Sequence, residues 1–185
     1  MTPMSAPVAA RVRAALFDTV IGACAISWRA DAVVGFRLPD IDPATTRAAL
    51  ERSGAMEIEP TGVIRDAVDG VRAHLDGALD DLRWIPLDLS GVPAFHRAVY
   101  TVTRAIDPGH TLTYGQVAER AGRPGAAQAV GQALGRNPIA LIVPCHRVLA
   151  ADHGLHGFSA PGVIHTTARL LPLEQTPGFG EPTLF

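Results

Sequence analysis

Apolar runs separated by turn residues occupy the first forty residues of the chain. Three such runs stand out, and they cover residues 13–17, 21–28 and 32–38. Short apolar runs bounded by turn signals are typical of strands joined by hairpins. We therefore predict a three-stranded antiparallel meander. Cys24 falls in the middle strand, where a small buried apolar residue is the simplest interpretation.

Helical spacing replaces this pattern after about residue 40. Asp42 followed by Pro43 combines a capping residue with the residue favoured in the first turn, and predicts a helix to about Arg52. A second helix is predicted to begin near Thr61, and apolar residues recur on one of its faces until about Gly77. Strands followed by helices indicate an α/β first half.

The end of this half carries two further features. His74 lies near the end of the second helix, where an exposed imidazole would interact favourably with the helix dipole. The stretch 85–91 has no helical spacing, so we predict a linker there. The first domain is then expected to cover residues 1–84.

Helical spacing returns in the second half. Residues 93–106 carry an apolar stripe, and Thr113 is placed to cap a short helix that ends at Arg120. A turn of Gly and Pro at 122–125 separates this helix from a second one, predicted at 126–134. Two short helices joined by a tight turn predict a helix-turn-helix, which is common in DNA-binding proteins.

The second of these helices has few large side chains. Ala127 and Ala129 are typical of it, and only Gln128 and Gln132 could reach base edges. Such a slim helix suits close approach to a narrow groove better than reading a base sequence. Tight packing against another helix explains the same composition, and both interpretations stay open here.

A thiol and an imidazole follow the helix pair. Asn137 precedes a proline and favours a turn, after which residues 141–143 predict a short buried strand that Pro144 ends. Cys145 and His146 come next. A thiol attacks as the thiolate, and a neighbouring imidazole lowers its pKa. The alternative is a structural cysteine beside an unrelated histidine.

Composition and charge refine this picture. The 185 residues are 48% hydrophobic and 18% charged, enough for one large or two small domains with a sizeable core. Residues 1–91 hold 9 Arg against 13 acidic residues, and residues 92–185 hold 7 against 5, so a polyanion would prefer the second half. The two cysteines, with no signal peptide or membrane-length apolar run in view, indicate a cytoplasmic protein.

Four segments of the second half resemble the O6-alkylguanine-DNA alkyltransferases, also called methylated-DNA–protein-cysteine methyltransferases. They are Tyr-Gly-Gln-Val-Ala at 114–118, Ala-Ala-Gln-Ala-Val-Gly at 126–131, Asn-Pro at 137–138 and Pro-Cys-His-Arg-Val at 144–148. The resemblance extends well over residues 92–174 and loosely over the first half. It implies an α/β fold with a ribonuclease-H-like domain at 1–84, and a mainly helical winged helix-turn-helix domain at 92–175. An irregular tail would cover 176–185.

The resemblance also implies a reaction. An alkyl group, a methyl in the simplest case, would pass directly and irreversibly from O6 of guanine in DNA to Cys145, so that each molecule acts once. Double-stranded DNA would be the partner, entered through its minor groove, with the damaged base flipped out because a thiol cannot reach O6 inside the stack. No cofactor and no metal are expected. We expect a monomer that does not bind membranes, and leave cooperative assembly on DNA open.

Roles carry over to individual residues. Cys145 would be the nucleophile, His146 a base acting through a water, Glu174 the residue that holds His146, and Asn137 the residue that fixes the turn. Substrate and DNA contacts would come from Tyr114, Ala127, Gln128, Ala129, Arg147, Val148, Phe158 and Ser159.

Four of these contacts have an expected partner. Tyr114 would bond the flipped base or its flanking phosphate, Val148 would offer its carbonyl to the guanine amino group, and Ser159 would lie on the loop that contacts O6. We expect Arg147 to pair within the protein rather than with substrate.

The sequence departs from the family pattern at several points. Gln128 stands where the family has an Arg that fills the gap left by the flipped base, and Phe158 stands where Tyr is usual. Pro172 would end or kink the last helix just before Glu174, and so disturb the contact between Glu174 and His146. The segment 162–169 lacks the usual Lys and is one residue longer.

These departures leave two alternative functions. One is a protein that binds alkylated DNA without repairing it. The other is an alkyltransferase specialised for another or bulkier lesion.

Overall fold

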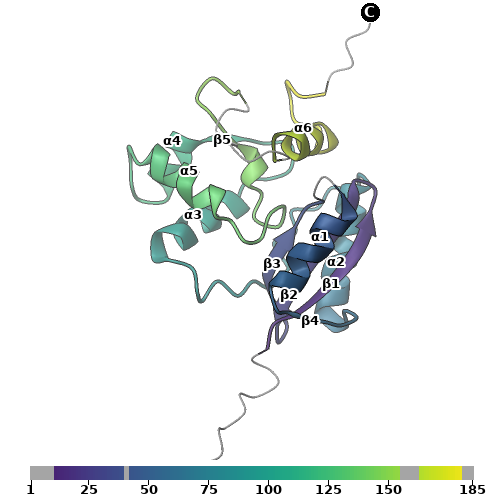
Figure 1. Cartoon of the computed structure of the whole chain (residues 1–185). Helices are drawn as coiled ribbons and strands as arrows, with labels where there is room; N and C mark the ends of the chain where they lie inside the picture. Colours follow the sequence, from purple (N-terminus) through teal and green to yellow (C-terminus); the bar gives the residue numbers. More distant parts are fainter. Residues whose placement is uncertain (1–10, 40–41, 155–162, 181–185) are drawn as a thin grey trace, which may run out of the picture.

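The computed structural model describes residues 11–39, 42–154 and 163–180. Its elements form a sheet part and a helical part, connected by an extended segment (Figure 1). The sheet part consists of β1 (Arg13–Thr19), β2 (Gly22–Arg29), β3 (Ala32–Arg37), α1 (Pro43–Arg52), β4 (Met56–Glu57) and α2 (Gly62–Leu75). The helical part consists of α3 (Ala94–Arg104), β5 (Leu112–Thr113), α4 (Tyr114–Arg120), α5 (Ala127–Gly135), the 3₁₀ helix η2 (Cys145–Arg147), β6 (Val148–Leu149) and α6 (Val163–Leu173). Within these ranges no helix is long and apolar enough to cross a bilayer.

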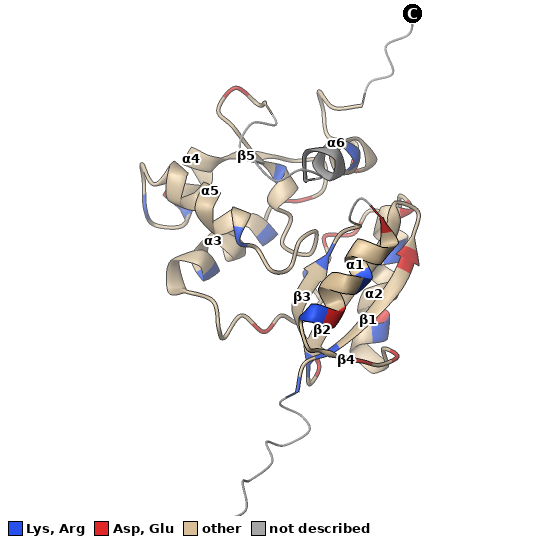
Figure 2. Ribbon diagram, viewed as in Figure 1, with Lys and Arg blue, Asp and Glu red and all other residues tan. Residues whose placement is uncertain are grey.

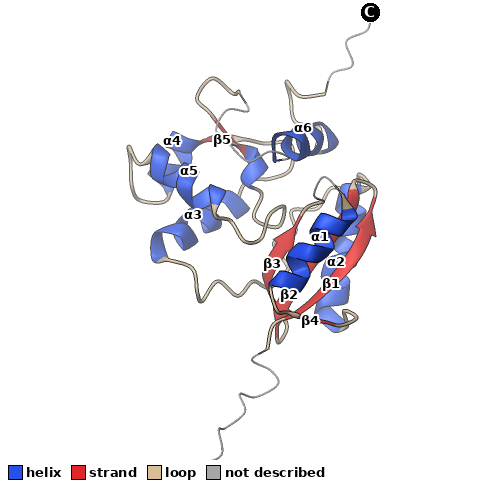
Figure 3. Cartoon of the chain, viewed as in Figure 1, coloured by secondary structure: helices blue, strands red, loops and turns tan. Residues whose placement is uncertain are grey.

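The predicted meander is confirmed. β1, β2 and β3 pair antiparallel in sequence order, and the short β4 adds to β1 in parallel, giving the order β3-β2-β1-β4. Alternate residues of β1 point to opposite faces, as the pleat requires. Ala14 packs with Leu50 of α1 on one face, whereas Phe17 belongs to the main core with Ile64 of α2. Helices therefore cover both faces of the sheet (Figure 3).

Local signals set the helix starts, as predicted. The Asp42 carboxylate accepts a hydrogen bond from the Thr45 backbone N–H at 2.8 Å at the start of α1. Thr113 and Gln116 form a reciprocal capping box at the start of α4. These side chains satisfy N–H groups that have no partner inside the helix.

The helix pair α4 and α5 is joined by a tight turn. Gly122 and Gly125 adopt φ values of +78° and +82°, which side chains disfavour, so the turn depends on glycine there. The two helices pack together and against α3. Val117 of α4 and Val130 of α5 are fully buried in the core, which supports this packing.

The apolar run before Cys145 is buried but is not a strand, so that prediction was wrong. Leu141 adopts φ +68° in a turn, and only single bridges form, between Ala140 and Val143 and between Ile139 and Phe36 of β3. A short apolar run shows that a segment is buried, but it does not distinguish a strand from a buried turn. The turn leads directly into η2, so Cys145 stands at the first position of a short helix.

Two segments of the chain lie along the outer edge of β3. In the predicted linker 85–91, Pro86 accepts a hydrogen bond from the Val33 N–H, and the Asp88 N–H bonds back to the Val33 carbonyl. Further along, the Pro138 carbonyl accepts from the Phe36 N–H at 2.9 Å. The segment 85–91 is therefore extended, as predicted, but it is also fixed to the sheet.

Candidate active site

Cys145 is held by the turn that precedes it. Asn137 donates from Nδ2 to the Val143 carbonyl at 2.9 Å and accepts from the Ile139 N–H at 3.0 Å, so one side chain closes the buried turn. Its amide also bonds the Cys145 thiol. Cys145 is partly exposed, whereas the residues on both sides of it are buried. Cys145 thus sits on a rigid base and, unlike its neighbours in the chain, keeps part of its surface exposed.

His146 is buried and bound on one side only. Its Nε2 lies 2.9 Å from Oε1 of Glu174. Because a carboxylate can only accept, the ring carries its proton on Nε2. Its Nδ1 is buried and has no hydrogen-bond partner among the described residues. A neutral imidazole in this state presents a free lone pair at Nδ1, which is what a base requires.

Glu174 also pairs with Arg147. The guanidinium donates from Nε to Oε2 at 2.9 Å and from Nη2 to Oε1 at 2.8 Å, a bidentate geometry. Its Nη1 donates to the Ile106 carbonyl at 2.6 Å. Arg147 is 1% exposed, so it pairs within the protein, as expected, and its place among the DNA-contacting residues is not supported.

Pro172 does not break the link between Glu174 and His146. It lies in the last turn of α6, and the Glu174 N–H still bonds the Leu170 carbonyl at 2.9 Å. Pro172 removes only its own N–H, and the helix ends one residue later. The disturbance expected from the sequence is therefore absent, and Glu174 stays buried beside His146.

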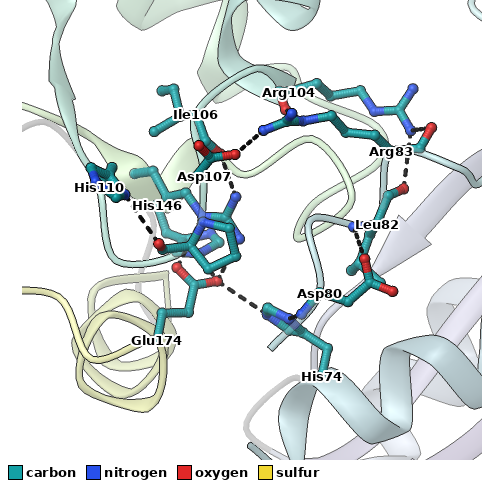
Figure 4. Close-up of polar contacts among 12 residues, drawn as sticks. His74, Asp80, Leu82, Arg83, Arg104, Ile106, Asp107, His110, His146 and Glu174 are labelled. Carbon is teal, nitrogen blue, oxygen red and sulfur yellow. Dashed lines mark hydrogen bonds and ion pairs between the residues drawn. The ribbon is translucent and has the colours of Figure 1, made fainter. Parts of the chain in front are cut away.

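His74 is a further partner that the sequence interpretation placed wrongly. It is fully buried rather than exposed, and its Nε2 lies 3.1 Å from Oε1 of Glu174 (Figure 4). The signal was present, because His74 follows the buried Ala67 and Val71 at helical spacing. Its place near the end of α2 favours exposure, but the helical spacing decides its burial.

Burial and charge set the protonation states of this cluster. Burial disfavours the charged form of Glu174, but the charge and hydrogen bond of His146 and the hydrogen bonds from His74 and Arg147 outweigh it, so its pKa lies well below the usual range. Burial lowers the pKa of His146, and Glu174 offsets this in part. Burial raises the pKa of Cys145, against the hydrogen bond from Asn137. The resting pair at neutral pH is therefore a neutral thiol and a neutral imidazole.

Two tyrosines lie near the thiol. Burial raises the pKa of Tyr114, and a thiolate at Cys145 would raise it further, because two negative charges repel each other. Burial and the same charge raise the pKa of Tyr100 to about 12. Tyr100 was not predicted; its hydroxyl donates to the Ala133 carbonyl at 2.8 Å and so ties α3 to α5.

The remaining predicted residues fall in three places. On α5, Gln128 is exposed, and Ala127 and Ala129 are half-buried. Val148 is buried in β6, where it pairs with Leu112 of β5. Phe158 and Ser159 lie outside the described residues.

Comparison with known proteins identifies the family. Residues 94–176 match the family model described as the 6-O-methylguanine DNA methyltransferase DNA-binding domain. The methylated-DNA–protein-cysteine methyltransferase of Mycobacterium tuberculosis is 42% identical over 124 residues, which cover 67% of this chain and 73% of the relative. That of Mycolicibacterium paratuberculosis is 36% identical over 168 residues, 91% and 95% of the two chains.

The fold agrees with a solved structure. Mycobacterium tuberculosis OGT in complex with DNA is similar with a TM-score of 0.72 at 32% sequence identity, over 90% of this chain and 96% of that one. The mixed α/β architecture is thus shared along nearly the whole length. The chain belongs to the family of methylated-DNA–protein-cysteine methyltransferases.

Proposed function

We propose that this protein repairs DNA by moving an alkyl group, a methyl in the simplest case, from O6 of guanine to Cys145. The observation that carries the proposal is a partly exposed cysteine, Cys145, followed directly by His146, which is bound to Glu174 through Nε2 and whose Nδ1 has no partner among the described residues. Because the proton of the ring is fixed on Nε2, Nδ1 is the nitrogen that can accept a proton.

The reaction balances without a cofactor. The thiol proton passes, through a water, to Nδ1 of His146, and the thiolate attacks the alkyl carbon. The bond between that carbon and O6 breaks, its electron pair stays on guanine, and guanine takes up a proton. The products are unmodified guanine and a thioether at Cys145. Since a thioether is a poor leaving group, each molecule acts once.

Glu174 supports this sequence electrostatically. As His146 gains a proton, the carboxylate at 2.9 Å stabilises the imidazolium. Asn137 positions the sulfur, and Tyr114, at the start of α4, bonds the flipped base or its phosphate. Val148 offers its carbonyl to the guanine amino group, and we assign Ser159 to the contact with O6.

DNA binding is assigned to the helical part. We take residues 92–175 as a winged helix-turn-helix domain that places α5 in the minor groove, with Ala127 and Ala129 allowing a close approach and Gln128 beside the flipped base. α5 carries no charged residue, and acidic residues gather on the sheet part (Figure 2). A phosphate backbone therefore meets less repulsion on the helical part.

The rest of the chain completes the proposal. Residues 1–84 form a ribonuclease-H-like domain, 85–91 the linker and 176–185 an irregular tail. The protein acts on double-stranded DNA in the cytoplasm as a monomer.

Intact mass after incubation with an oligonucleotide containing O6-methylguanine tests the function. We expect a gain of one methyl group, mapped to the peptide that holds Cys145. Cys145→Ala should gain nothing and still bind the oligonucleotide; a variant that still takes up the methyl group would overturn the assignment of the nucleophile.

The same assay separates the alternatives. No gain, with selective binding to the damaged oligonucleotide, would favour a protein that recognises the lesion without repairing it. Faster transfer of a bulkier O6 substituent than of methyl would favour a specialised alkyltransferase. Both alternatives are motivated by Gln128, which is exposed and stands where the family has an Arg.

A further inference from the structure

His74 connects the sheet part to the proposed active site. It lies on α2, one hundred residues before Glu174 in the sequence, and its side chain is fully buried. Its Nδ1 accepts a hydrogen bond from the Asp80 backbone N–H at 3.2 Å, so the proton of the neutral ring is on Nε2. That proton is directed at Oε1 of Glu174, as the dashed line in Figure 4 marks.

The donors around Glu174 are distributed unevenly. Among the described residues, Oε1 accepts from three groups, Nε2 of His74, Nε2 of His146 and Nη2 of Arg147, whereas Oε2 accepts from Nε of Arg147 alone. The last torsion of a glutamate is soft, so the carboxylate plane depends on its donors. His74 comes from a different element than the other two donors and therefore restrains the plane independently.

The segment that holds His74 is itself firmly connected. Asp80, whose N–H binds His74, accepts through its carboxylate from the Leu82 N–H and from the indole N–H of Trp84, both at 2.9 Å. Arg83 pairs with Asp107, and its Nε donates to the Arg104 carbonyl at 2.9 Å (Figure 4).

Arg104 donates back across the same junction. Its Nη2 binds the Leu82 carbonyl at 3.1 Å and the Ile85 carbonyl at 3.0 Å. Two arginines thus fasten the end of α3 to the segment that follows α2. The position of His74 relative to Glu174 is set by this junction rather than by the histidine alone.

We propose that His74 is a positioning residue for alkyl transfer, holding the Glu174 carboxylate in the plane that serves His146. The inference rests on the proposed function, and it gives the sheet part an indirect role in the chemistry, exerted through Glu174. His74 touches neither the thiol nor the substrate and acts only through Glu174.

The surrounding charges predict a signature in the pH profile. His146 interacts with Glu174, Arg147 and His74, and His74 interacts with Glu174 and Asp80. Donation by His74 draws negative charge away from Glu174 and so makes His146 less basic. Without that donor, the pKa of His146 should rise, and the acid limb of the rate profile should move to higher pH.

A matched pair of variants separates the two hydrogen bonds of His74. His74→Gln places an amide N–H near the position of Nε2 and keeps the bond to Glu174. His74→Asn places an amide oxygen near the position of Nδ1, keeps the bond to Asp80 and loses the one to Glu174. His110→Phe is the control, because His110 is exposed and bonds only the Pro108 carbonyl.

The readout is the single-turnover rate with saturating O6-methylguanine duplex, measured across pH. We expect His74→Asn to slow transfer on the order of 10- to 100-fold, with its acid limb moved to higher pH and its affinity for DNA unchanged. His74→Gln should recover most of the rate, and His110→Phe should match the wild type. Equal losses in the Asn and Gln variants, or a wild-type rate and profile in His74→Asn, would overturn the proposal.

Two further results keep the test decisive. If the wild-type chain gains no methyl group, the proposed function fails. If the wild type is methylated and His74→Asn reacts equally fast, the proposed function stands and only the role of His74 is removed. If a variant does not fold, ¹⁵N resonances of the wild-type rings decide. His74 must be the neutral Nε2–H tautomer and must shift as His146 titrates, and independent behaviour of the two rings contradicts the proposal.

Discussion

At the scale of single residues, the site uses opposite pKa shifts on two adjacent side chains. Burial lowers the pKa of His146 and raises that of Cys145. The base is thus kept unprotonated and the nucleophile protonated over the same range of pH. Proton transfer therefore belongs to the reaction itself, and the thiol is not reactive at rest.

This arrangement predicts a broad pH plateau. The transfer rate should fall only below the ordinary histidine value of about 6.5, because a lowered pKa keeps His146 neutral further into acid. It should rise only above the ordinary cysteine value of about 8.5, where the thiolate forms without help. Single-turnover rates from pH 5 to 10 check this, and a rate that climbs steadily through neutrality would show a preformed thiolate instead.

The buried ion pair of Glu174 and Arg147 predicts a large loss of stability when the carboxylate is replaced by an amide. Glu174→Gln leaves the charge of Arg147 buried and unpaired, so we expect a loss of about 3–5 kcal/mol in the free energy of unfolding. Urea denaturation measures it. Arg47→Gln breaks the exposed Arg47–Glu57 pair as a control and should cost below about 1 kcal/mol. Equal losses in the two variants would mean that the buried pair does not stabilise the fold.

At the scale of elements, the sequence predicted best where signals are local. The three strands, the Asp42 cap and the Thr113 cap follow from residues within a few positions of each other. The strand at 141–143 was wrong because the shape of that segment is set by Asn137 and by contact with β3. Local pattern carries no information about such partners.

The site was predictable in part for the same reason. Cys145, His146 and Asn137 lie within ten residues, and a motif reports them together. Tyr100 was missed, because a tyrosine in an apolar helix stripe is ordinary core material. The contact between His74 and Glu174 spans one hundred residues, and only the tertiary fold brings the two side chains together.

The slim helix α5 leads to a prediction about affinity. Gln128 is exposed on this helix and carries no charge. Gln128→Arg adds a cation that can neutralise a phosphate or stack on a base, so duplex binding should tighten and alkyl transfer should speed up. Binding titrations at two salt concentrations with single-turnover rates check this. Tighter binding with slower transfer would show that the site is adapted to glutamine.

At the scale of the whole molecule, the buried cluster around Glu174 makes the free energy of unfolding depend on pH in the acid range. The pKa of Glu174 is lowered by folding, so its contribution is complete above the unfolded value of about 4.3 and is lost as the pH falls toward the folded value. The free energy of unfolding should therefore drop below about pH 4.3. The free energy of unfolding is measured against pH for the wild type and for Glu174→Gln, and the difference between the two curves isolates the contribution of Glu174. Identical slopes against pH for the two proteins would contradict this prediction.

The two segments that lie along β3 have a consequence for self-association. An edge strand with free N–H and C=O groups can pair with the edge of a second molecule. Here the outer edge of β3 is occupied by backbone around Pro86 and Pro138, which accept hydrogen bonds but, having no N–H, cannot extend a ladder. At the opposite edge, the two-residue β4 pairs only with the start of β1, at Arg13 and Ala14. The connection that orients the two parts thus also protects the outer edge of β3 from pairing with a second molecule.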